Sequence, residues 1–405
     1  MLTNQQQLII KKSGLILKEH GVDLTTHFYA RMFKGNPELK QIFNRGHQEA
    51  GHQQQALAAA VAAYAINIDN PSVLSTALTH IAHKHVSLGI RAEHYSIVGK
   101  HLLASIKEVL GDAADNELLD AWGIAYNQLA EMLIEEEKNI YFSTANKNGG
   151  WTGWRGFKVV RKVIESSEIT SFYLRPADEG AVPDYLPGQY ISVRLFVPEW
   201  GLMQPRQYSL SDAPGKDYLR ISVKREDVRG DYPAGRVSNV LHGSINEGDV
   251  IDVSPPAGDF FLNSKNKSPV ILISGGVGLT PMVSMLNQLI QNRDERHIMY
   301  LHATRNRNTH AMRDHVNNIA SSHPNIKKII YYEDVASTDR IGIDHDRQGR
   351  INLTDLPEEY LPRNGEYYLC GPLSFMKHQY QSLASLDISP KQIHFEAFGT
   401  GTLDL

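Results

Sequence analysis

The stretch PVILISGGVGLTP, residues 269–281, decides the fold of the last third of this chain. The run VILIS is typical of a buried strand, and the glycines that follow it predict a tight turn. Pro281 suits the first turn of a helix, where its missing N–H leaves no hydrogen bond unmade. The stretch therefore predicts a strand, a glycine turn and a helix in direct succession.

The same alternation continues toward the C-terminus. The segments HIMYLHAT (297–304), IKKIIYYE (326–333) and EYYLCGP (366–372) have the composition of further strands. Strands that alternate with helical segments predict a doubly wound α/β domain with a parallel sheet, here residues 265–405. Ligands bind beyond the carboxyl ends of such strands, so the two glycine turns are expected to face one crevice.

The first of these turns has the pattern of a dinucleotide site, because residues 276–281 are spaced G-x-G-x-x-P. Glycines let the backbone approach a pyrophosphate, and the helix N-terminus offers free N–H groups and a positive dipole. In the second turn Cys370 either lines a nicotinamide pocket or is a buried residue at a strand end. The expected cofactor contacts are Gly276, Val277, Gly278, Leu279, Thr280, Pro281, Cys370, Gly371 and Pro372.

Upstream, residues 154–264 have the pattern of an antiparallel β-barrel. Short runs of β-forming residues are separated by turns such as PGQY (187–190) and NEGD (246–249). Strands that are this short and this regularly spaced are typical of barrels and sandwiches. The expected strands are Phe157–Ile164, Thr170–Arg175, Tyr190–Phe196, Gln207–Ser211, Tyr218–Lys224 and Asp249–Val253.

Residues 1–142 are expected to form an all-α domain. Apolar residues recur there at helical spacing, with Pro37, Pro71 and Gly111 at the boundaries. Residues 143–153, rich in Gly, Asn and Ser, predict a linker to the barrel. The expected helices lie near 4–20, 22–34, 52–68, 72–87, 93–110 and 116–142.

Composition narrows the class of protein. A chain of 405 residues has room for two or three domains, and its formal charge of −4 offers no broad attraction to nucleic acid. The only cysteine cannot form an internal disulfide and fits a reducing compartment. The N-terminus lacks a secretory pattern, and no apolar run approaches the roughly 20 residues that span a membrane. We therefore expect a cytoplasmic protein.

The barrel segment carries a possible flavin motif, Arg206-Gln207-Tyr208-Ser209. It offers a guanidinium for phosphate, an aromatic face for an isoalloxazine ring and a hydroxyl for a ring nitrogen. Gly235-Arg236-Val237-Ser238-Asn239 could offer backbone N–H groups to a pyrophosphate. Followed by the two glycine turns, these motifs make residues 155–405 resemble the ferredoxin–NADP⁺ reductase family.

That resemblance implies FAD in the barrel and NADH or NADPH on the α/β domain. It also implies that the C-terminal Glu396-Ala397-Phe398-Gly399 covers the flavin, with Phe398 over the ring and Glu396 tuning its potential. The chain departs from the family at Ala397, where Cys is common, and at Thr400, where Pro is common. The implied FAD contacts are Tyr190, Arg206, Gln207, Tyr208 and Ser209.

The helical half contains three informative segments. They are HFYARMFKGNPELKQIFN (27–44), HIAHKHVSLGI (80–90), in which His85 lies late in an expected helix, and EHYSIVGKHLL (93–103). Together they resemble the globin domain of the flavohaemoglobin family, so the resemblance covers the whole chain. It implies haem b in the helical domain.

The resemblance also assigns roles around the iron. His85 would be the metal ligand, with Tyr95 and Glu137 as its hydrogen-bonded relay, although Glu135 or Glu136 stands in if the alignment slips. On the distal side, Tyr29 would donate its O–H to O₂. The remaining implied residues are Gln53 beside Tyr29, Leu57 and Phe43 against the haem, and Lys84 next to the ligand.

The implied activity is that of a nitric oxide dioxygenase, in which NAD(P)H reduces FAD, FAD reduces haem, and haem-bound O₂ oxidises NO to nitrate. Its partners would be NO, O₂ and NAD(P)H, with no nucleic acid and no obligatory protein partner. A monomer is expected, and a lipid in the distal haem pocket is left open. The alternatives are a haem-based sensor of O₂ or NO, a general flavin reductase of ferric or quinone acceptors, and a zinc site at His80, His83 and His85.

Overall fold

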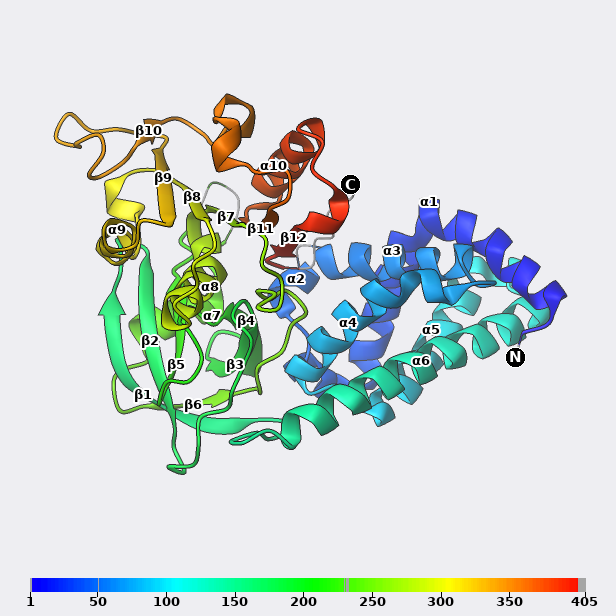
Figure 1. Cartoon of the computed structure of the whole chain (residues 1–405). Helices are drawn as coiled ribbons and strands as arrows, with labels where there is room; N and C mark the ends of the chain where they lie inside the picture. Colours follow the sequence, from blue (N-terminus) through cyan, green and yellow to red (C-terminus); the bar gives the residue numbers. More distant parts are fainter. Residues whose placement is uncertain (1, 50, 229, 231–232, 400–405) are drawn as a thin grey trace. The chain divides into compact units, whose positions relative to one another are not determined.

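The computed structural model describes residues 2–49, 51–228, 230 and 233–399, so Thr400 lies outside the described residues. Figure 1 shows its elements in sequence colours. The chain forms two compact units. The first holds Met1–Arg155, Ser192–Arg206 and Asp252–Asp259, and the second holds Gly156–Ile191, Gln207–Ile251 and Phe260–Leu405.

The N-terminal segment is helical, as expected. Helix α1 packs against α3 and α5, and α4 packs against α6. Large side chains such as Phe28, Met32, Tyr64 and Trp122 fill the core between these helices. The helices are α1 (Asn4–Gly35), α2 (Arg45–Glu49), α3 (His52–Ile66), α4 (Ser75–Leu88), α5 (Ala92–Leu110) and α6 (Asn116–Ala145).

Helix α1 differs from its prediction, because the two expected helices near 4–20 and 22–34 form one continuous helix. Gly21 does not break it. A Cβ added at Gly21 would lie 3.0 Å from the Cβ of Ala58 on α3. The glycine therefore permits close helix packing, and this packing outweighs its low helix propensity. At the other end, α6 runs to Ala145 and enters the segment expected to be a linker.

The middle of the chain forms a six-stranded sheet in the order β4-β3-β6-β1-β2-β5. The pairs β1–β2, β2–β5 and β3–β6 are antiparallel. A bridge between Leu210 and Ile221 links the end of β4 to β5, and this closes the sheet into a barrel. The elements are β1 (Arg155–Ile164), β2 (Ile169–Pro176), β3 (Tyr190–Val197), β4 (Leu202–Ser209), β5 (Leu219–Lys224), β6 (Val250–Val253) and helix α7 (Arg236–Gly243).

Strand β4 begins earlier than predicted, at Leu202 instead of Gln207, and ends at Ser209 instead of Ser211. Pro205 lies inside it, which counts against a strand in sequence reasoning because proline has no N–H for a ladder bond. Strand β4 stands at the end of the strand order, and its bridge to β5 is made at Leu210, beyond Pro205, so the strand can carry a proline.

The C-terminal segment forms a parallel sheet in the order β10-β9-β8-β7-β11-β12. Alternate strand residues serve opposite faces. Val270 and Leu272 pack with α8 and α9 on one face, while Ile271 and Ile273 pack with α10 on the other. The elements are β7 (Val270–Gly275), α8 (Leu279–Gln291), β8 (Ile298–Thr304), α9 (Arg313–Ser322), β9 (Ile326–Tyr332), β10 (Arg347–Gln348), β11 (Glu366–Gly371), α10 (Leu373–Ser385) and β12 (Ile393–Ala397).

This strand order confirms the doubly wound prediction. The chain moves outward from β7 through β8 and β9, and then returns to the other side of β7 with β11. The order reverses between β7 and β11, where such sheets bind their ligands. In the described part of the chain, no helix has the length and apolar character to cross a membrane.

Candidate haem, flavin and nicotinamide sites

A set of hydrogen-bonded polar side chains in the helical domain surrounds His85, near the end of α4. The Nδ1 of His85 lies 2.7 Å from Oε1 of Glu137 on α6 and 3.0 Å from the hydroxyl of Tyr95 on α5. Tyr95 also donates a hydrogen bond to Glu137. Because the carboxylate accepts, the proton of the imidazole resides on Nδ1, and Nε2 carries a lone pair that is able to bind a metal ion.

Burial reinforces this set. Glu137 is only 2% exposed. Burial and then the neighbouring Glu137 hold the pKa of Tyr95 far above its ordinary value, so this hydroxyl remains a donor. The other two glutamates of the run have different partners, since Glu136 accepts from Thr79 and Glu135 pairs with Lys138. Glu137 is therefore the carboxylate that faces His85.

The zinc alternative has no geometry in its favour. The Nδ1 of His80 faces Asp259, that of His83 accepts from the Gly258 N–H, and that of His85 faces Glu137. Across residues 2–49, 51–228, 230 and 233–399, no three His, Cys, Asp or Glu side chains are grouped to hold a metal ion.

Tyr29, the expected distal donor, is 6% exposed and surrounded by aromatic rings. Its ring centroid lies 5.0 Å from that of Phe28 and 5.9 Å from that of Phe43, both in edge-to-face arrangements. Burial raises the pKa of the Tyr29 hydroxyl far above its ordinary value, although a hydrogen bond from Gln53 lowers it in part. The hydroxyl is therefore a permanent donor that also accepts from Gln53.

Sequence reasoning missed a second glutamine, Gln48, which is hydrogen-bonded to Gln53. The amide Nε2 of Gln48 donates to Oε1 of Gln53 at 2.6 Å. Gln54 in turn donates through Nε2 to the backbone carbonyl of Gln48 at 3.1 Å and to its Oε1 at 3.3 Å. No sequence signal singled out Gln48, because it lies in a glutamine-rich segment and the choice depends on side-chain direction.

These bonds fix the direction of each amide. A carbonyl oxygen can only accept, so the backbone of Gln48 forces the nitrogen of Gln54 toward it. The oxygen of Gln48 then faces Gln54, its nitrogen faces Gln53, and the nitrogen of Gln53 is left for Tyr29. The Tyr29 proton consequently points away from Gln53 and is available to a ligand.

These donors fit a haem group. An imidazole with a carboxylate behind it is a typical proximal ligand. Phe43 and Leu57 are half-buried apolar side chains beside the Tyr29 cluster, which suits a porphyrin. Lys84 is half-buried, and its carbonyl accepts from Ser87. The ligand chemistry therefore supports iron at His85 with Tyr29 as distal donor.

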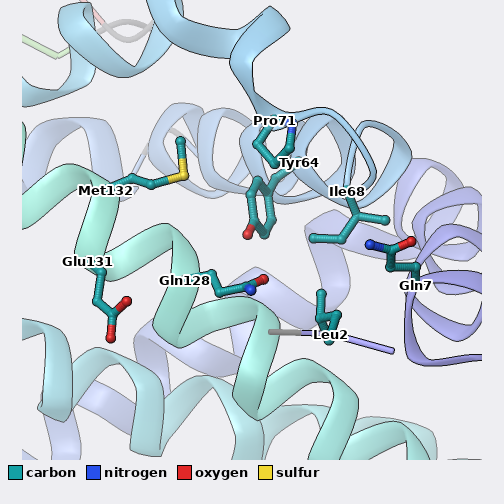
Figure 2. A pocket seen from close by; sticks show the side chains of 8 residues that line it. All are labelled: Leu2, Gln7, Tyr64, Ile68, Pro71, Gln128, Glu131 and Met132. Carbon is teal, nitrogen blue, oxygen red and sulfur yellow. The ribbon is translucent and has the colours of Figure 1, made fainter. Parts of the chain in front are cut away.

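A separate pocket in the helical domain involves none of the predicted residues (Figure 2). It has a volume of about 370 Å³ and is open to solvent. Figure 2 shows the Tyr64 ring between the other lining side chains, and this hydroxyl donates to the Ala125 carbonyl. The lining residues are Leu2, Gln7, Tyr64, Ile68, Pro71, Gln128, Glu131 and Met132.

The predicted flavin residues lie on two adjacent strands. Tyr190 begins β3 and is 7% exposed, while Ser209 ends β4 and is 6% exposed. Arg206, Gln207 and Tyr208 between them are half-buried. Strand β3 neighbours β4 in the strand order of the sheet.

The turn and the helix that were predicted beside the flavin residues are both formed. Gly188 has φ +112°, and a Cβ there would lie 2.7 Å from the Met285 Cε, so the PGQY turn requires glycine. Helix α7 begins at Arg236 with Gly235 as its N-cap, in the segment predicted to offer N–H groups. Ser238 and Asn239 donate their side-chain hydrogen bonds to the Gly235 carbonyl.

The two glycine turns of the α/β domain touch each other. Gly276 has φ +55°, and a Cβ added at Gly278 would lie 2.5 Å from the carbonyl carbon of Cys370 and 2.7 Å from the nitrogen of Gly371. Only glycine allows this approach. The predicted residues Val277, Leu279 and Pro281 continue the turn into α8, and the Thr280 hydroxyl donates to the Val277 carbonyl.

Cys370 is fully buried and belongs to the core between β11 and α8. Burial, and next the charge of Glu396, raise the pKa of its thiol well above the ordinary value, so it stays protonated. Glu396 pairs with Cys370 across β12 and β11 and is 8% exposed. Pro372 and Gly399 are exposed, Ala397 is half-buried, and Phe398 is 45% exposed.

Comparisons with known proteins match three successive segments of the chain to three families. The globin family matches residues 26–133. The oxidoreductase FAD-binding domain matches residues 156–262, and the oxidoreductase NAD-binding domain matches residues 272–381. The predicted borders 1–142, 143–153, 154–264 and 265–405 remain predictions.

Three full or partial relatives extend the comparison. A flavohemoprotein of Bordetella pertussis is 60% identical over 402 residues, which is 99% of each chain. The crystal structure of a Malassezia yamatoensis flavohemoglobin with bound FAD and heme has a TM-score of 0.85 at 29% identity, covering 98% of this chain and 100% of that one. The FAD/NAD-binding domain of a Vibrio cholerae nitric oxide dioxygenase has a TM-score of 0.55 at 38% identity, covering 60% of this chain and 98% of that one.

Two observations show the family: the sequence identity to the Bordetella pertussis flavohemoprotein over the whole length of both chains, and the order of the three domains. The chain therefore belongs to the flavohaemoglobin family, in which a globin is joined to the FAD- and NAD-binding domains of an oxidoreductase.

Proposed function

We propose that this oxidoreductase is a nitric oxide dioxygenase, which converts two NO and two O₂ to two nitrate with the hydride of one NAD(P)H and releases one proton. The observation that carries the proposal is the hydrogen-bonded set His85, Tyr95 and Glu137. The Vibrio cholerae relative, a nitric oxide dioxygenase by name, supports it.

The proximal set favours oxygen activation over oxygen storage. Glu137 accepts the Nδ1 proton of His85, which makes Nε2 a stronger electron donor. Tyr95 holds the carboxylate in place from the other side. A buried carboxylate that is fixed in this way keeps the imidazole in one tautomer throughout the reaction.

The distal residues orient the substrate. Tyr29 donates a hydrogen bond from its hydroxyl. Because Gln48 orients the Gln53 amide so that it donates to Tyr29, the Tyr29 proton points away from Gln53. Phe43 and Leu57 keep the surroundings apolar, so water competes poorly for the same donor. We assign Lys84 the lesser role of adjusting the charge next to His85.

Two cofactors would complete the chemistry when bound: haem would supply the iron for O₂, and FAD would pass on the hydride electrons of NAD(P)H one at a time. The chain would hold the flavin with Tyr190 and residues 206–209, and cover it with residues 396–399. The NAD(P)H would lie on residues 276–281 and 370–372, where the backbone is free of side-chain bulk.

The test is the rate of NADH-dependent NO loss in air by purified protein loaded with haem and FAD, with nitrate measured as the product. We expect His85→Ala to abolish NO loss, while His20→Ala, at an exposed position of α1, leaves it unchanged. NO loss that persists in His85→Ala would contradict the proposal and favour a general flavin reductase. Haem that binds NO or O₂ without turnover would favour a sensor.

A further inference from the structure

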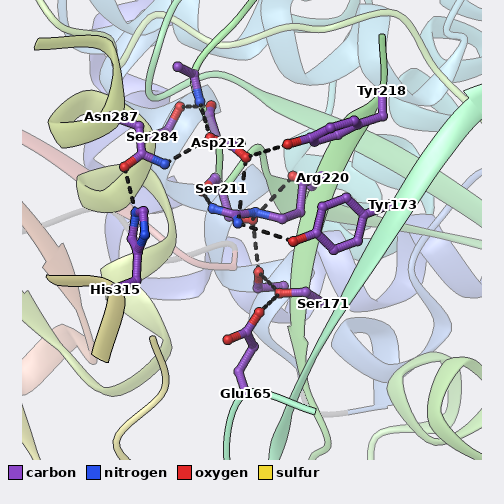
Figure 3. A network of polar contacts seen from close by, with 12 residues as sticks. Glu165, Ser171, Tyr173, Ser211, Asp212, Tyr218, Arg220, Ser284, Asn287 and His315 are labelled. Carbon is purple, nitrogen blue, oxygen red and sulfur yellow. Dashed lines mark hydrogen bonds and ion pairs between the residues drawn. The ribbon is translucent and has the colours of Figure 1, made fainter. Parts of the chain in front are cut away.

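A buried carboxylate, that of Asp212, lies just beyond the end of β4 within a polar network (Figure 3). Asp212 is 7% exposed. Burial raises its pKa, but Arg220 and several hydrogen-bond donors lower it by more, so the pKa lies below its ordinary value and the group is ionised at neutral pH. A buried charge persists only where partners compensate it.

One set of partners comes from the barrel. The Arg220 Nη1 on β5 lies 3.5 Å from Oδ2 of Asp212, and the Tyr218 hydroxyl donates to the same oxygen at 2.9 Å. The Ala213 N–H donates to Oδ1 at 2.8 Å. These bonds fix the carboxylate relative to the strands that close the barrel.

A second set comes from helix α8. The amide Nδ2 of Asn287 donates to Oδ1 of Asp212 at 2.7 Å, and the Ser284 hydroxyl donates to the Asp212 carbonyl at 2.6 Å. Ser284 and Asn287 are spaced i, i+3 and therefore share one face of α8. The helix is thus attached to Asp212 at two points.

The direction of the Asn287 amide is fixed as well. Its Oδ1 lies 2.7 Å from Nε2 of His315 on α9, as Figure 3 shows. Reversing the amide would place its oxygen against the Asp212 carboxylate, with two acceptors in contact. The contact between Asp212 and α8 therefore has a single stable arrangement.

The attachment joins the two elements to which we assigned the cofactors. Strand β4 carries the flavin residues 206–209, and α8 begins directly after the turn 276–278 that we assigned to the dinucleotide. Resting on that proposed function, we propose that Asp212 is a positioning residue that sets the nicotinamide at hydride-transfer distance from the flavin, through Ser284 and Asn287.

The size of the effect follows from the geometry of hydride transfer. Reacting atoms must approach to about 3–3.5 Å, and a misplacement of about 1 Å can cost on the order of a hundredfold in rate. Releasing α8 from Asp212 leaves α8 packed on its own sheet, so a smaller displacement follows. We expect a loss of about tenfold in hydride transfer, with the flavin still bound.

The test uses the full chain with both cofactors bound. The double variant Ser284→Ala/Asn287→Ala removes both hydrogen bonds from α8 to Asp212 and keeps the ion pair of Asp212 with Arg220. Gln288→Ala is the matched control, because the Gln288 amide bonds Asn292, the residue that caps the end of the same helix, and not Asp212. Flavin reduction by saturating NADH is followed without oxygen, together with the deuterium isotope effect and the charge-transfer absorbance of reduced flavin with NAD⁺.

We expect slower flavin reduction at saturation and weaker charge-transfer absorbance in the double variant, with flavin content and reduction by dithionite as in the parent. The single variant Ser284→Thr keeps the hydroxyl and an intact Asn287, so its flavin reduction should be faster than that of the double variant. Parent-like reduction at saturating NADH, or a change confined to NADH affinity, would overturn the proposal. If the double variant does not fold, Ser284→Ala alone is measured in the same way. NO plays no part in these measurements, so they fail independently of the dioxygenase assay.

Discussion

At the scale of single residues, the expected haem site depends more on the orientation of its polar side chains than on the residue types. Tyr29, Gln53 and Gln48 are polar side chains that many helical domains contain, yet each amide here has a defined orientation. The same holds for His85, whose tautomer is set by Glu137. Both sides of the expected haem site therefore depend on where protons point, and two predictions test this on the distal side.

Replacing Tyr29 by Phe removes the distal donor and keeps the ring. We expect faster dissociation of O₂ from the reduced, haem-loaded protein, by about fivefold or more, because a buried hydrogen bond of about 1 kcal/mol is lost. NO consumption should fall, while flavin reduction by NADH stays the same. Stopped-flow displacement of O₂ by CO measures the rate, and unchanged kinetics would remove Tyr29 from its role.

Replacing Gln48 by Ala frees the amide of Gln53 to turn over. Its oxygen would then accept the Tyr29 proton, so we expect O₂ dissociation to rise by about two- to fivefold, less than in Tyr29→Phe. Gln55→Ala, at an exposed position of α3, is the control. In the Tyr29→Phe background the effect of Gln48→Ala should vanish. Equal effects in both backgrounds would show that Gln48 acts elsewhere.

At the scale of elements, glycines decide how closely segments approach. Gly21 allows α1 to contact α3, and Gly278 allows the dinucleotide turn to contact the end of β11. In the first case sequence reasoning took the glycine as the border between two helices. In the second it predicted a tight glycine turn between a strand and a helix, and the structure contains that turn.

Replacing Gly278 by Ala would push the Cβ into the backbone of Cys370 and Gly371. Because a backbone carbonyl cannot rotate away as a side chain can, we expect a loss of about 1–3 kcal/mol in the free energy of unfolding. NADH affinity should fall by about tenfold or more. Gly243→Ala, with open space around its Cβ, is the control. Calorimetry measures the stability of both variants, and titration measures their NADH affinity. Parent-like stability and NADH affinity in Gly278→Ala would contradict the close approach.

At the scale of the whole molecule, stability should depend on pH through buried histidines. Burial lowers the pKa of the His302 imidazole to about 4. It also lowers the pKa of His310, whose ring centroid lies 5.3 Å from that of His302. Unfolded histidine titrates near pH 6.5. Between about pH 6.5 and 4 the unfolded chain therefore binds a proton that the folded chain excludes, and stability falls as the pH falls.

From pH 7 to pH 5 we expect His302 alone to remove about 2 kcal/mol from the free energy of unfolding. Denaturant unfolding of the full chain at the two pH values measures the change. His302→Asn, which can still bond the Ser274 hydroxyl, should lose less stability than the parent over the same range. His20→Asn, at an exposed position, should lose as much as the parent, and an equal loss in His302→Asn would contradict the prediction.

The sequence by itself determined the three types of domain and their order. Those inferences rest on local physics, since periodicity, glycine turns and strand-turn-helix succession are all encoded by neighbouring residues. Most of the residues assigned to haem and flavin came instead from the resemblance to known families. That resemblance named Glu137 as the carboxylate beside His85, with Glu135 and Glu136 as the alternatives.

Tertiary structure alone decided which glutamate faces His85, that Gln48 orients Gln53, and that Asp212 attaches β4 to α8. It also decided that α1 is one helix and that β4 tolerates Pro205. The physical reason is common to all of them. Each depends on the direction of a side chain or on the approach of segments far apart in sequence, and composition and spacing carry no information about either.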